Sequence, residues 1–240
     1  MDIKELESGV DPKTHWYYQS KKIPLFSFVK KINRQLGKPL TIIDFGAGSG
    51  FFSYELEQFN PELTEKIYLV DIEYSDKELS DTKGQKIEKR REMPDNVESA
   101  VVVMMDVLEH IEHDDAVLAH IKSKCLKNCY YFITVPAFLS LWSGHDVYLG
   151  HYRRYRIPTL RSLLNKVGFE IGNISYLYGS IFPLVWAVRM LTKNTTSKSS
   201  MAPVNPFANS ILKAYNSAEM SLGRYNKLFG VTCTAEGKIC

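Results

Sequence analysis

The sequence predicts an α/β fold, with a mostly parallel sheet covered by helices on both faces. Short apolar runs rich in β-branched residues alternate with segments that repeat apolar residues at helical spacing, which is the pattern of successive βαβ units. Residues 100–105 are apolar without a break, as expected for a strand that is buried on both sides. With 240 residues, of which 45% are hydrophobic, the chain is long enough to bury the core of one domain.

Seven strands are expected along this domain, and the third is the weakest. They lie at residues 40–45, 66–71, 86–90, 100–105, 130–135, 169–178 and 230–235. Helices are expected at residues 49–59, 114–124 and 158–167, the last with a proline near its start and Gly168 after its end. The helix after the third strand is expected to shrink to residues 93–96.

The single domain divides into four parts. They are a helical N-terminal segment at 1–38, a core at 39–178, a helical insertion at 179–229 and a last strand within 230–240. The insertion is expected to hold helices at 181–191 and 210–228 and to cover the ligand site as a lid.

Composition and charge exclude several classes of protein. A net charge of +3 and a sequence pI near 8.5 are too weak to indicate DNA binding. The four cysteines fit no zinc template and no disulfide framework, which favours a reducing cytoplasm. The N-terminus lacks the apolar run of a signal peptide. Residues 174–191 are too short and too broken to span a membrane, although peripheral contact with an inner membrane is an alternative.

The first expected strand runs into a glycine loop, Asp44-Phe-Gly46-Ala47-Gly48-Ser-Gly50. Glycines let the backbone turn sharply and approach a ligand closely, and the amides of the following helix point to the same place. A dinucleotide fingerprint needs glycine where Phe51 stands, and a P-loop needs a Gly-Lys-Ser/Thr that is absent. Asp71, which ends the second strand, can accept hydrogen bonds from both hydroxyls of a ribose.

The loop resembles motif I of the class I S-adenosylmethionine-dependent methyltransferases. Residues 105–111, with Asp106-Val-Leu-Glu109-His110, are similar to a segment of the ubiquinone-biosynthesis-like branch of that family. Residues 135–155, which end in Gly-His151-Tyr-Arg-Arg-Tyr, resemble a bacterial subgroup. The resemblance implies a Rossmann-like seven-stranded sheet, S-adenosyl-L-methionine as cofactor and S-adenosyl-L-homocysteine as product. The family often has an acidic residue directly after the third strand, near the adenine. This sequence departs from that pattern, since the region reads Lys89-Arg-Arg-Glu92 and offers only Glu92 for the role.

The resemblance also implies which residues hold the cofactor. They are Asp44, Gly46, Ala47, Gly48, Gly50, Asp71, Ile72, Asp106, Val107, Leu108, Trp16 and Tyr17. Trp16 and Tyr17 belong to an aromatic cluster in the N-terminal segment and are expected to close over the cofactor.

Methyl transfer to a hydroxyl is an in-line displacement that needs an aligned acceptor and a base for its proton. Alignment contributes up to about 7–11 kcal/mol, and a general base contributes about 10²–10⁴-fold. Histidine suits the base role because its unperturbed pKa is about 6.5. His145, His151 and His110 follow expected strand ends and are the candidates, although His110 can instead have a packing role.

An aromatic and basic segment is expected to bind the acceptor. Its candidate residues are Arg153, Arg154, Tyr155 and Trp142. Two arginines can bind an anionic or hydroxylated group in bidentate fashion. The alternative is a structural loop held by Arg–Asp pairs.

The predicted function is a methyltransferase that acts on a small-molecule or lipid- or sugar-linked acceptor, at oxygen, without a metal. One alternative is a metal-assisted RNA-terminal 2′-O-methyltransferase, in which Asp106, Glu109 and His110 combine with His145 or His151 around Mg²⁺ or Mn²⁺. Another is a non-catalytic nucleotide-binding module that docks a partner through the insertion. The acceptor and the oligomeric state stay open at this point.

Overall fold

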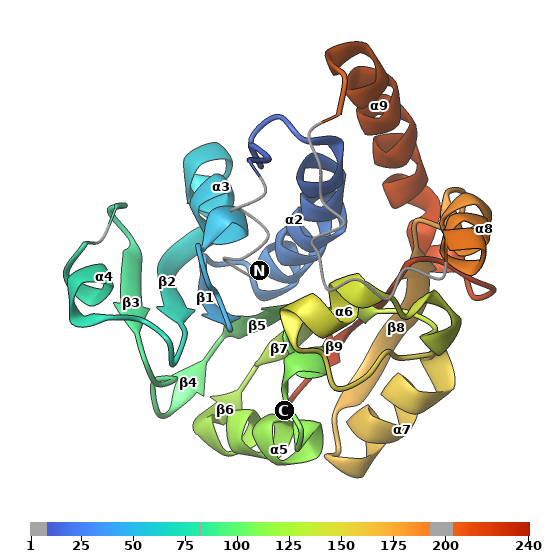
Figure 1. The fold of residues 1–240 in the computed structure, drawn as a ribbon. Helices are drawn as coiled ribbons and strands as arrows, with labels where there is room; N and C mark the ends of the chain where they lie inside the picture. The colour runs from blue at the N-terminus through green and yellow to red at the C-terminus, as the bar shows by residue number, and fades with distance from the viewer. Residues whose placement is uncertain (1–8, 82, 193–203) are drawn as a thin grey trace.

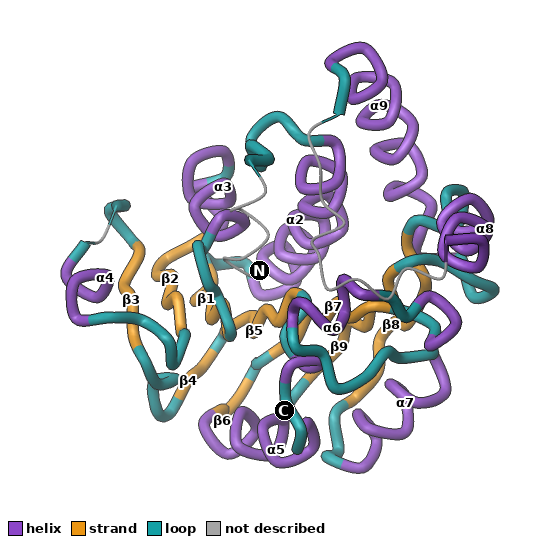
Figure 2. Tube along the Cα trace, in the orientation of Figure 1, coloured by secondary structure: helices purple, strands orange, loops and turns teal. Residues whose placement is uncertain are grey.

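The computed structural model describes residues 9–81, 83–192 and 204–240 (Figure 1). Its centre is a seven-stranded sheet in the order β3-β2-β1-β5-β7-β9-β8, and Figure 2 shows helices on both sides of it. All neighbours pair in parallel except β9, which is antiparallel to β7 and β8. The strands are β1 Leu40–Phe45, β2 Thr64–Val70, β3 Ile87–Arg90, β5 Ala100–Met105, β7 Tyr130–Pro136, β8 Glu170–Leu177 and β9 Thr232–Lys238. The predicted fold class and all seven expected strands are thereby confirmed.

Helices and short 3₁₀ turns connect these strands. The helices are α2 Trp16–Leu36, α3 Phe51–Phe59, α4 Asp76–Ser80, α5 Asp114–Lys124, α6 Gly144–Leu149, α7 Ile157–Lys166, α8 Phe182–Thr192 and α9 Pro206–Leu222. The 3₁₀ turns are η1 Pro61–Leu63, η2 Leu108–His110, η3 Leu139–Leu141 and η4 Gly223–Tyr225. A separate pair of very short parallel strands joins β4 Val97–Glu98 to β6 Cys125–Lys127.

The sheet is buried on both faces, and β5 shows how its sequence achieves this. All six residues of β5 are buried. Val102 and Met104 belong to the core cluster that packs under α5 and α7, and Val101 and Val103 belong to the cluster under α2 and α3. Alternate side chains of a strand point to opposite faces, so a continuous apolar run serves both layers.

The strand order reverses at β1, which lies between β2 and β5. Ligands of open parallel sheets bind beyond the carboxyl ends of the strands at such a switch point. The glycine loop follows β1, Asp71 follows β2 and Asp106 follows β5. The fold therefore brings the three predicted cofactor segments to one edge of the sheet.

The insertion between β8 and β9 holds α8 and α9, as expected. The backbone amide of Gly179, just before α8, donates to Glu219 Oε1 of α9 at 2.5 Å, and α9 packs along α2 (Figure 1). Among the described residues, no helix combines the length and apolar character needed to cross a membrane.

Two sequence expectations were wrong in detail. The second insertion helix begins at Pro206 and ends at Leu222 rather than spanning 210–228. Its true start has a clear signal, because the Asn205 side chain accepts from the Phe207 amide at 2.9 Å with proline at the first helical position. Residues 93–96 form irregular backbone with a bend at Asp95 and Asn96 instead of the expected short helix.

Candidate functional site

The glycine loop has the backbone conformation that only glycine adopts without strain. Gly46, Gly48 and Gly50 have φ angles of 71°, 51° and 69°, in the left-handed region that disfavours side chains. A Cβ on Gly46 would lie 2.7 Å from the methyl carbons of Val107, and one on Gly50 would lie 2.5 Å from Leu69 Cδ1. The loop therefore sits directly against the carboxyl ends of β2 and β5.

Asp71 and Tyr74 hold the middle of this loop. The Gly48 amide donates to Asp71 Oδ2 at 2.8 Å, and the Glu73 amide donates to Asp71 Oδ1 at 3.0 Å. The Tyr74 hydroxyl donates to the Gly48 carbonyl at 2.8 Å. Each carboxylate oxygen can accept more than one hydrogen bond, so Asp71 keeps acceptor capacity for a ribose. The neighbouring Ile72 is 79% exposed, which leaves an apolar surface next to that carboxylate.

Asp44 lies beneath the loop rather than in the cleft. It is buried, and its Oδ2 accepts a hydrogen bond from Ser53 Oγ of α3 at 2.7 Å. Burial raises the pKa of Asp44 above its ordinary value, and the hydrogen bond from Ser53 only partly offsets this. Asp44, the first acid of the loop, therefore links β1 to α3 through its hydrogen bond with Ser53.

Asp106 is paired with Lys21, a cation that no sequence pattern indicated. The buried Lys21 ammonium of α2 donates to Asp106 Oδ2, and it also donates to the Tyr17 hydroxyl at 2.8 Å. Thr134 Oγ1 of β7 donates to Asp106 Oδ1 at 3.1 Å. Burial acts to raise the pKa of Asp106, but the charge and hydrogen bond of Lys21 outweigh it and hold that pKa below its ordinary value.

Aromatic rings enclose this ion pair on the side of the insertion. The Tyr17 and Tyr178 rings stack with centroids 5.4 Å apart, and the Trp16 ring meets Tyr178 edge-on at 6.0 Å. Tyr178 is fully buried, and its hydroxyl lies 3.0 Å from Ser20 Oγ. The structure thus places Trp16 and Tyr17 beside the Asp106 end of the cleft.

Beyond Asp106, the structure brings together Glu109, His110 and His151. One ligand atom from each lies within 4.8 Å of the other two, and the two imidazole rings meet edge to face with centroids 4.6 Å apart. Glu109 is 1% exposed, and its Oε2 has no hydrogen-bond partner among the described residues. Burial, followed by the negative charge of Asp106, raises the pKa of Glu109 well above its ordinary value.

Asp146 fixes the orientation of His151. Its carboxylate is completely buried, and the distance from Asp146 Oδ1 to His151 Nδ1 is 3.0 Å. Arg154 binds the same carboxylate in bidentate fashion, Nε to Oδ1 at 2.7 Å and Nη2 to Oδ2 at 3.1 Å. Burial acts to raise the pKa of Asp146, but hydrogen bonds from His151 and Arg154 hold it far below its ordinary value. An ionised Asp146 only accepts, so Nδ1 of His151 carries the proton that lies between them.

The remaining predicted acceptor residues have partners within the protein. Arg153 Nη1 lies 3.0 Å from Asp114 Oδ2 and its Nη2 donates to the Glu112 carbonyl at 2.6 Å. The Tyr155 hydroxyl donates to Asp114 Oδ2 at 2.8 Å. These contacts, like Arg154 with Asp146, match the alternative of a loop held by Arg–Asp pairs.

His145 and Trp142 are half-buried residues of the same segment. His145 lies on α6 directly before Asp146, and Trp142 follows η3. His145 does not share the group formed by Glu109, His110 and His151, as far as the described residues show.

Lys21, Thr134 and Arg189 belong to the site although no sequence pattern indicated them. Arg189 on α8 has its Nη1 3.7 Å from Asp146 Oδ2, and burial lowers its pKa to about 10. Lys21 lies in a run of polar and aromatic residues that a sequence pattern assigns to a solvated helix face. The one sequence signal for Lys21 is its position, four residues or about one helical turn after Tyr17 of the aromatic cluster.

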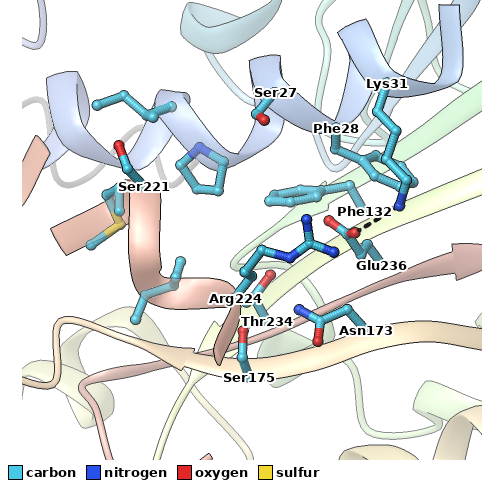
Figure 3. Close-up of a pocket in the computed structure, with 14 residues that line it drawn as sticks. Ser27, Phe28, Lys31, Phe132, Asn173, Ser175, Ser221, Arg224, Thr234 and Glu236 are labelled. Atoms are coloured by element: carbon cyan, nitrogen blue, oxygen red, sulfur yellow. Dashed lines mark hydrogen bonds and ion pairs between the residues drawn. The ribbon is translucent and has the colours of Figure 1, made fainter. Parts of the chain in front are cut away.

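A pocket of about 230 Å³ lies apart from this site, between α2 and the β8–β9 end of the sheet (Figure 3). Figure 3 shows the Lys31 ammonium reaching Glu236 across it, at 3.3 Å. Ser175, whose hydroxyl has no partner among the described residues, also contributes to the wall. None of the predicted site residues lines this pocket.

Comparisons with known proteins agree with this architecture. A family model described as "Methyltransferase domain" matches residues 16–173, more than half of the chain. No curated protein matches the chain.

Several solved structures share the fold. A chain of the complex between the Haloferax volcanii Trm112 methyltransferase activator and the putative methyltransferase is 12% identical with a TM-score of 0.52, covering 84% of this chain and 82% of that one. An S-adenosylmethionine-dependent methyltransferase from Mesorhizobium loti is 12% identical with a TM-score of 0.50, covering 84% and 91%. One from Archaeoglobus fulgidus is 21% identical with a TM-score of 0.49, covering 88% and 92%.

The cradle fits the cofactor that the sequence implied. Three left-handed glycines let the loop lie close against the strand ends, where Gly46 and Gly50 have no space for a Cβ, and Asp71 stands at the end of the adjacent strand. The family match extends from the first residue of α2 to β8, so it includes Lys21, the glycine loop, Asp71, Asp106 and His151. The chain belongs to the methyltransferase domain family, and we conclude that it is an S-adenosylmethionine-dependent methyltransferase.

Proposed function

We propose that the chain methylates a hydroxyl oxygen of a small-molecule or lipid- or sugar-linked acceptor. The observation that carries this proposal is the Asp146–His151 pair, with 3.0 Å between Oδ1 and Nδ1, beside the Glu109–His110 end of η2. When bound, S-adenosylmethionine supplies a methyl group made electrophilic by its sulfonium. A hydroxyl acceptor must lose its proton, and a histidine fixed by a carboxylate is suited to take it.

The cofactor contacts of the proposal follow from the cleft. Asp71 accepts from the ribose hydroxyls, and the exposed Ile72 packs against the adenine. The amino-acid end of the cofactor is a zwitterion, and the Lys21–Asp106 pair offers one group of each charge within the same cleft. Lys21 then binds the carboxylate and Asp106 the ammonium, while the main-chain amides of the glycine loop face the same end.

On the acceptor side, His151 Nε2 takes the proton and Asp146 positions the ring. His110 packs edge-on against His151 and limits its rotation. Arg154 and Arg189 hold Asp146, so they are positioning residues. Arg153 and Trp142, both half-buried in the segment that carries His151, are the proposed acceptor contacts.

The proposal is tested by transfer of a labelled methyl group to a panel of phenols, sugars and isoprenoid-linked phenols, each matched with its amine analogue. His151→Ala is expected to lower transfer by about 10²–10⁴-fold with S-adenosylhomocysteine affinity unchanged. His145→Ala is the matched control and is expected to keep most activity. Full activity in both variants would remove the base assignment, and transfer only to the amines would remove the oxygen assignment.

A second candidate is supported by the unpartnered Glu109 carboxylate. Glu109, His110 and His151 offer one oxygen and two nitrogens within 4.8 Å, and Asp146 orients His151 as carboxylates orient metal-binding histidines. These side chains would suit a divalent cation that binds the acceptor hydroxyl and lowers its pKa. Calorimetric titration with Mn²⁺ or Zn²⁺, and its loss in Glu109→Gln, tests this candidate. Full activity in chelator would contradict it.

A further inference from the structure

The sheet face beneath α2 changes character toward its β8–β9 end. At the centre of the sheet this face presents apolar side chains, among them Ile42, Val101 and Phe132. On β8 and β9 the same face carries four polar side chains, paired across the strands as Asn173 with Glu236 and Ser175 with Thr234. A covered sheet face is normally apolar throughout, so this polar stretch points to a role other than packing.

The four polar side chains form the floor of the pocket of about 230 Å³ in Figure 3. α2 lies over them, and α9 with η4 closes one side. The rest of the wall is apolar and includes Phe28, Phe132, Leu177 and Met220. An apolar protein cavity of about 150 Å³ binds benzene, so this pocket has room for one six-membered ring with a substituent.

Arg224 brings a cation into this pocket. It belongs to η4, directly after α9, and Figure 3 shows its side chain extending into the pocket toward Phe132 and Glu236. Its guanidinium lies 5.5 Å from the centroid of the Tyr225 ring, and it pairs with no carboxylate in the part of the chain that the structure describes. A guanidinium presents planar N–H donors that match the two oxygens of a carboxylate. Arg224 therefore offers the pocket a cation that no described residue neutralises.

The floor adds further donors. The Lys227 ammonium donates to Asn173 Oδ1 at 2.7 Å. Because this contact uses the amide oxygen, the NH₂ group of Asn173 stays available as a donor. Ser175 is completely buried, and its hydroxyl has no hydrogen-bond partner among the described residues. Buried polar groups are nearly always hydrogen-bonded, so a ligand with an acceptor group would satisfy the floor.

The charges around the pocket favour an anionic ligand. Three of the lining residues are charged, and Lys31 and Glu236 neutralise each other across a distance of 3.3 Å. Arg224 is the third, so the wall carries a net charge of +1. Burial, and then the positive charges of Arg161 and Arg224, lower the pKa of the neighbouring Lys227 below its ordinary value. The local potential is therefore positive, which attracts an anion.

We propose that this pocket is a second small-molecule site, which binds an organic acid with one carboxylate and an apolar body about the size of one six-membered ring. The carboxylate binds the guanidinium of Arg224 and accepts from the NH₂ group of Asn173. The ring packs against Phe28 and Phe132, whose own rings lie 5.9 Å apart between centroids. None of the residues assigned above to the cofactor or the acceptor lines the pocket, so the acid and S-adenosylmethionine bind at the same time.

The test is calorimetric titration of the full chain with benzoate, phenylacetate and cyclohexanecarboxylate, each with and without saturating S-adenosylhomocysteine. At least one acid is expected to bind saturably, with the same affinity in both conditions. Benzyl alcohol, the uncharged counterpart of benzoate, is expected to bind at least about tenfold more weakly, because it loses the charged hydrogen bonds. Absence of saturable binding by all of these acids would overturn the proposal. Displacement of the acid by S-adenosylhomocysteine would also overturn it, since the acid would then lie in the cofactor cleft.

Two variants of the pocket wall should change the affinity for the acid in opposite directions. Arg224→Gln is expected to weaken binding by about 10–100-fold, and Glu236→Gln is expected to tighten it severalfold, because it removes the negative charge of the wall. Arg34→Gln is the matched control, since Arg34 is an exposed arginine of α2 that does not line the pocket. Circular dichroism and S-adenosylhomocysteine binding are expected to stay unchanged in all of these variants. Wild-type affinity in Arg224→Gln, or an equal loss in Arg34→Gln, would overturn the proposal.

Discussion

The ammonium of Lys21, on the helix that precedes the sheet, donates a hydrogen bond to the carboxylate of Asp106 at the carboxyl end of β5. The lysine side chain is 2% exposed and the aspartate side chain 31%. Asp106 also has a φ of 57°, a left-handed conformation that a non-glycine residue adopts only when its surroundings compensate. The pair therefore ties α2 to the cofactor end of the sheet.

Removing one member of this pair should cost stability. Lys21→Met leaves the Asp106 carboxylate without its counter-charge, and we expect a loss of about 2–3 kcal/mol, below the value for a fully buried pair because Asp106 keeps some solvent contact. The double variant Lys21→Met with Asp106→Asn should recover most of that loss. Urea unfolding measures both. Equal destabilisation in the single and double variants would show that the ion pair is not the cause.

Substitution of Asp146 should destabilise the folded protein more than substitution of a surface acid. Asp146→Asn leaves the Arg154 guanidinium, 3% exposed, without its carboxylate, and we expect a loss of about 3–5 kcal/mol. Asp115→Asn is the control, because it breaks an exposed ion pair with Lys166 and should change the unfolding midpoint much less. A similar small shift in both variants would contradict the buried network described here.

Glu109 should make stability fall as the pH rises. Its folded-state pKa lies well above the ordinary value, so the folded state keeps a proton that the unfolded state loses, and stability declines from about pH 4.5 up to the folded pKa. Glu109→Gln removes this titration. The variant should match the wild type near pH 4 and exceed its thermal midpoint at pH 8. An identical pH profile for both proteins would show that the Glu109 carboxyl is solvated or paired.

Much of the fold is predictable because its strands are strong local signals. Residues 100–105 and 130–135 are nearly all apolar and can only be central strands, and β1 is followed by a loop that needs three glycines. The short β4 and β6 escaped prediction, since two or three residues give no periodicity. Short α6 escaped for the same reason, although Ser143 caps it through Asp146, with Ser143 N to Asp146 Oδ2 at 2.8 Å.

The site is predictable only where it follows strand ends. Gly46, Asp71 and Asp106 each follow a strand, so topology alone gathers them. Lys21 comes from a helix far away in sequence, and only packing of α2 on the sheet brings its ammonium to Asp106. The pairing of Arg154 with Asp146 likewise depends on how the segment after β7 folds back, which no local pattern specifies.

The central claim is that the glycine loop and Asp71 bind S-adenosylmethionine. Calorimetric titration of the wild type and of Asp71→Asn with S-adenosylhomocysteine, in chelator-treated buffer, tests it most directly. We expect micromolar or tighter binding by the wild type, and affinity lower by about 10–100-fold in Asp71→Asn, since a hydrogen bond to a charged group contributes about 1.5–3 kcal/mol. Asp81→Asn, which changes an exposed acid directly after α4, should bind like the wild type. Absence of binding by the folded wild type, or equal affinity in Asp71→Asn, would contradict the account.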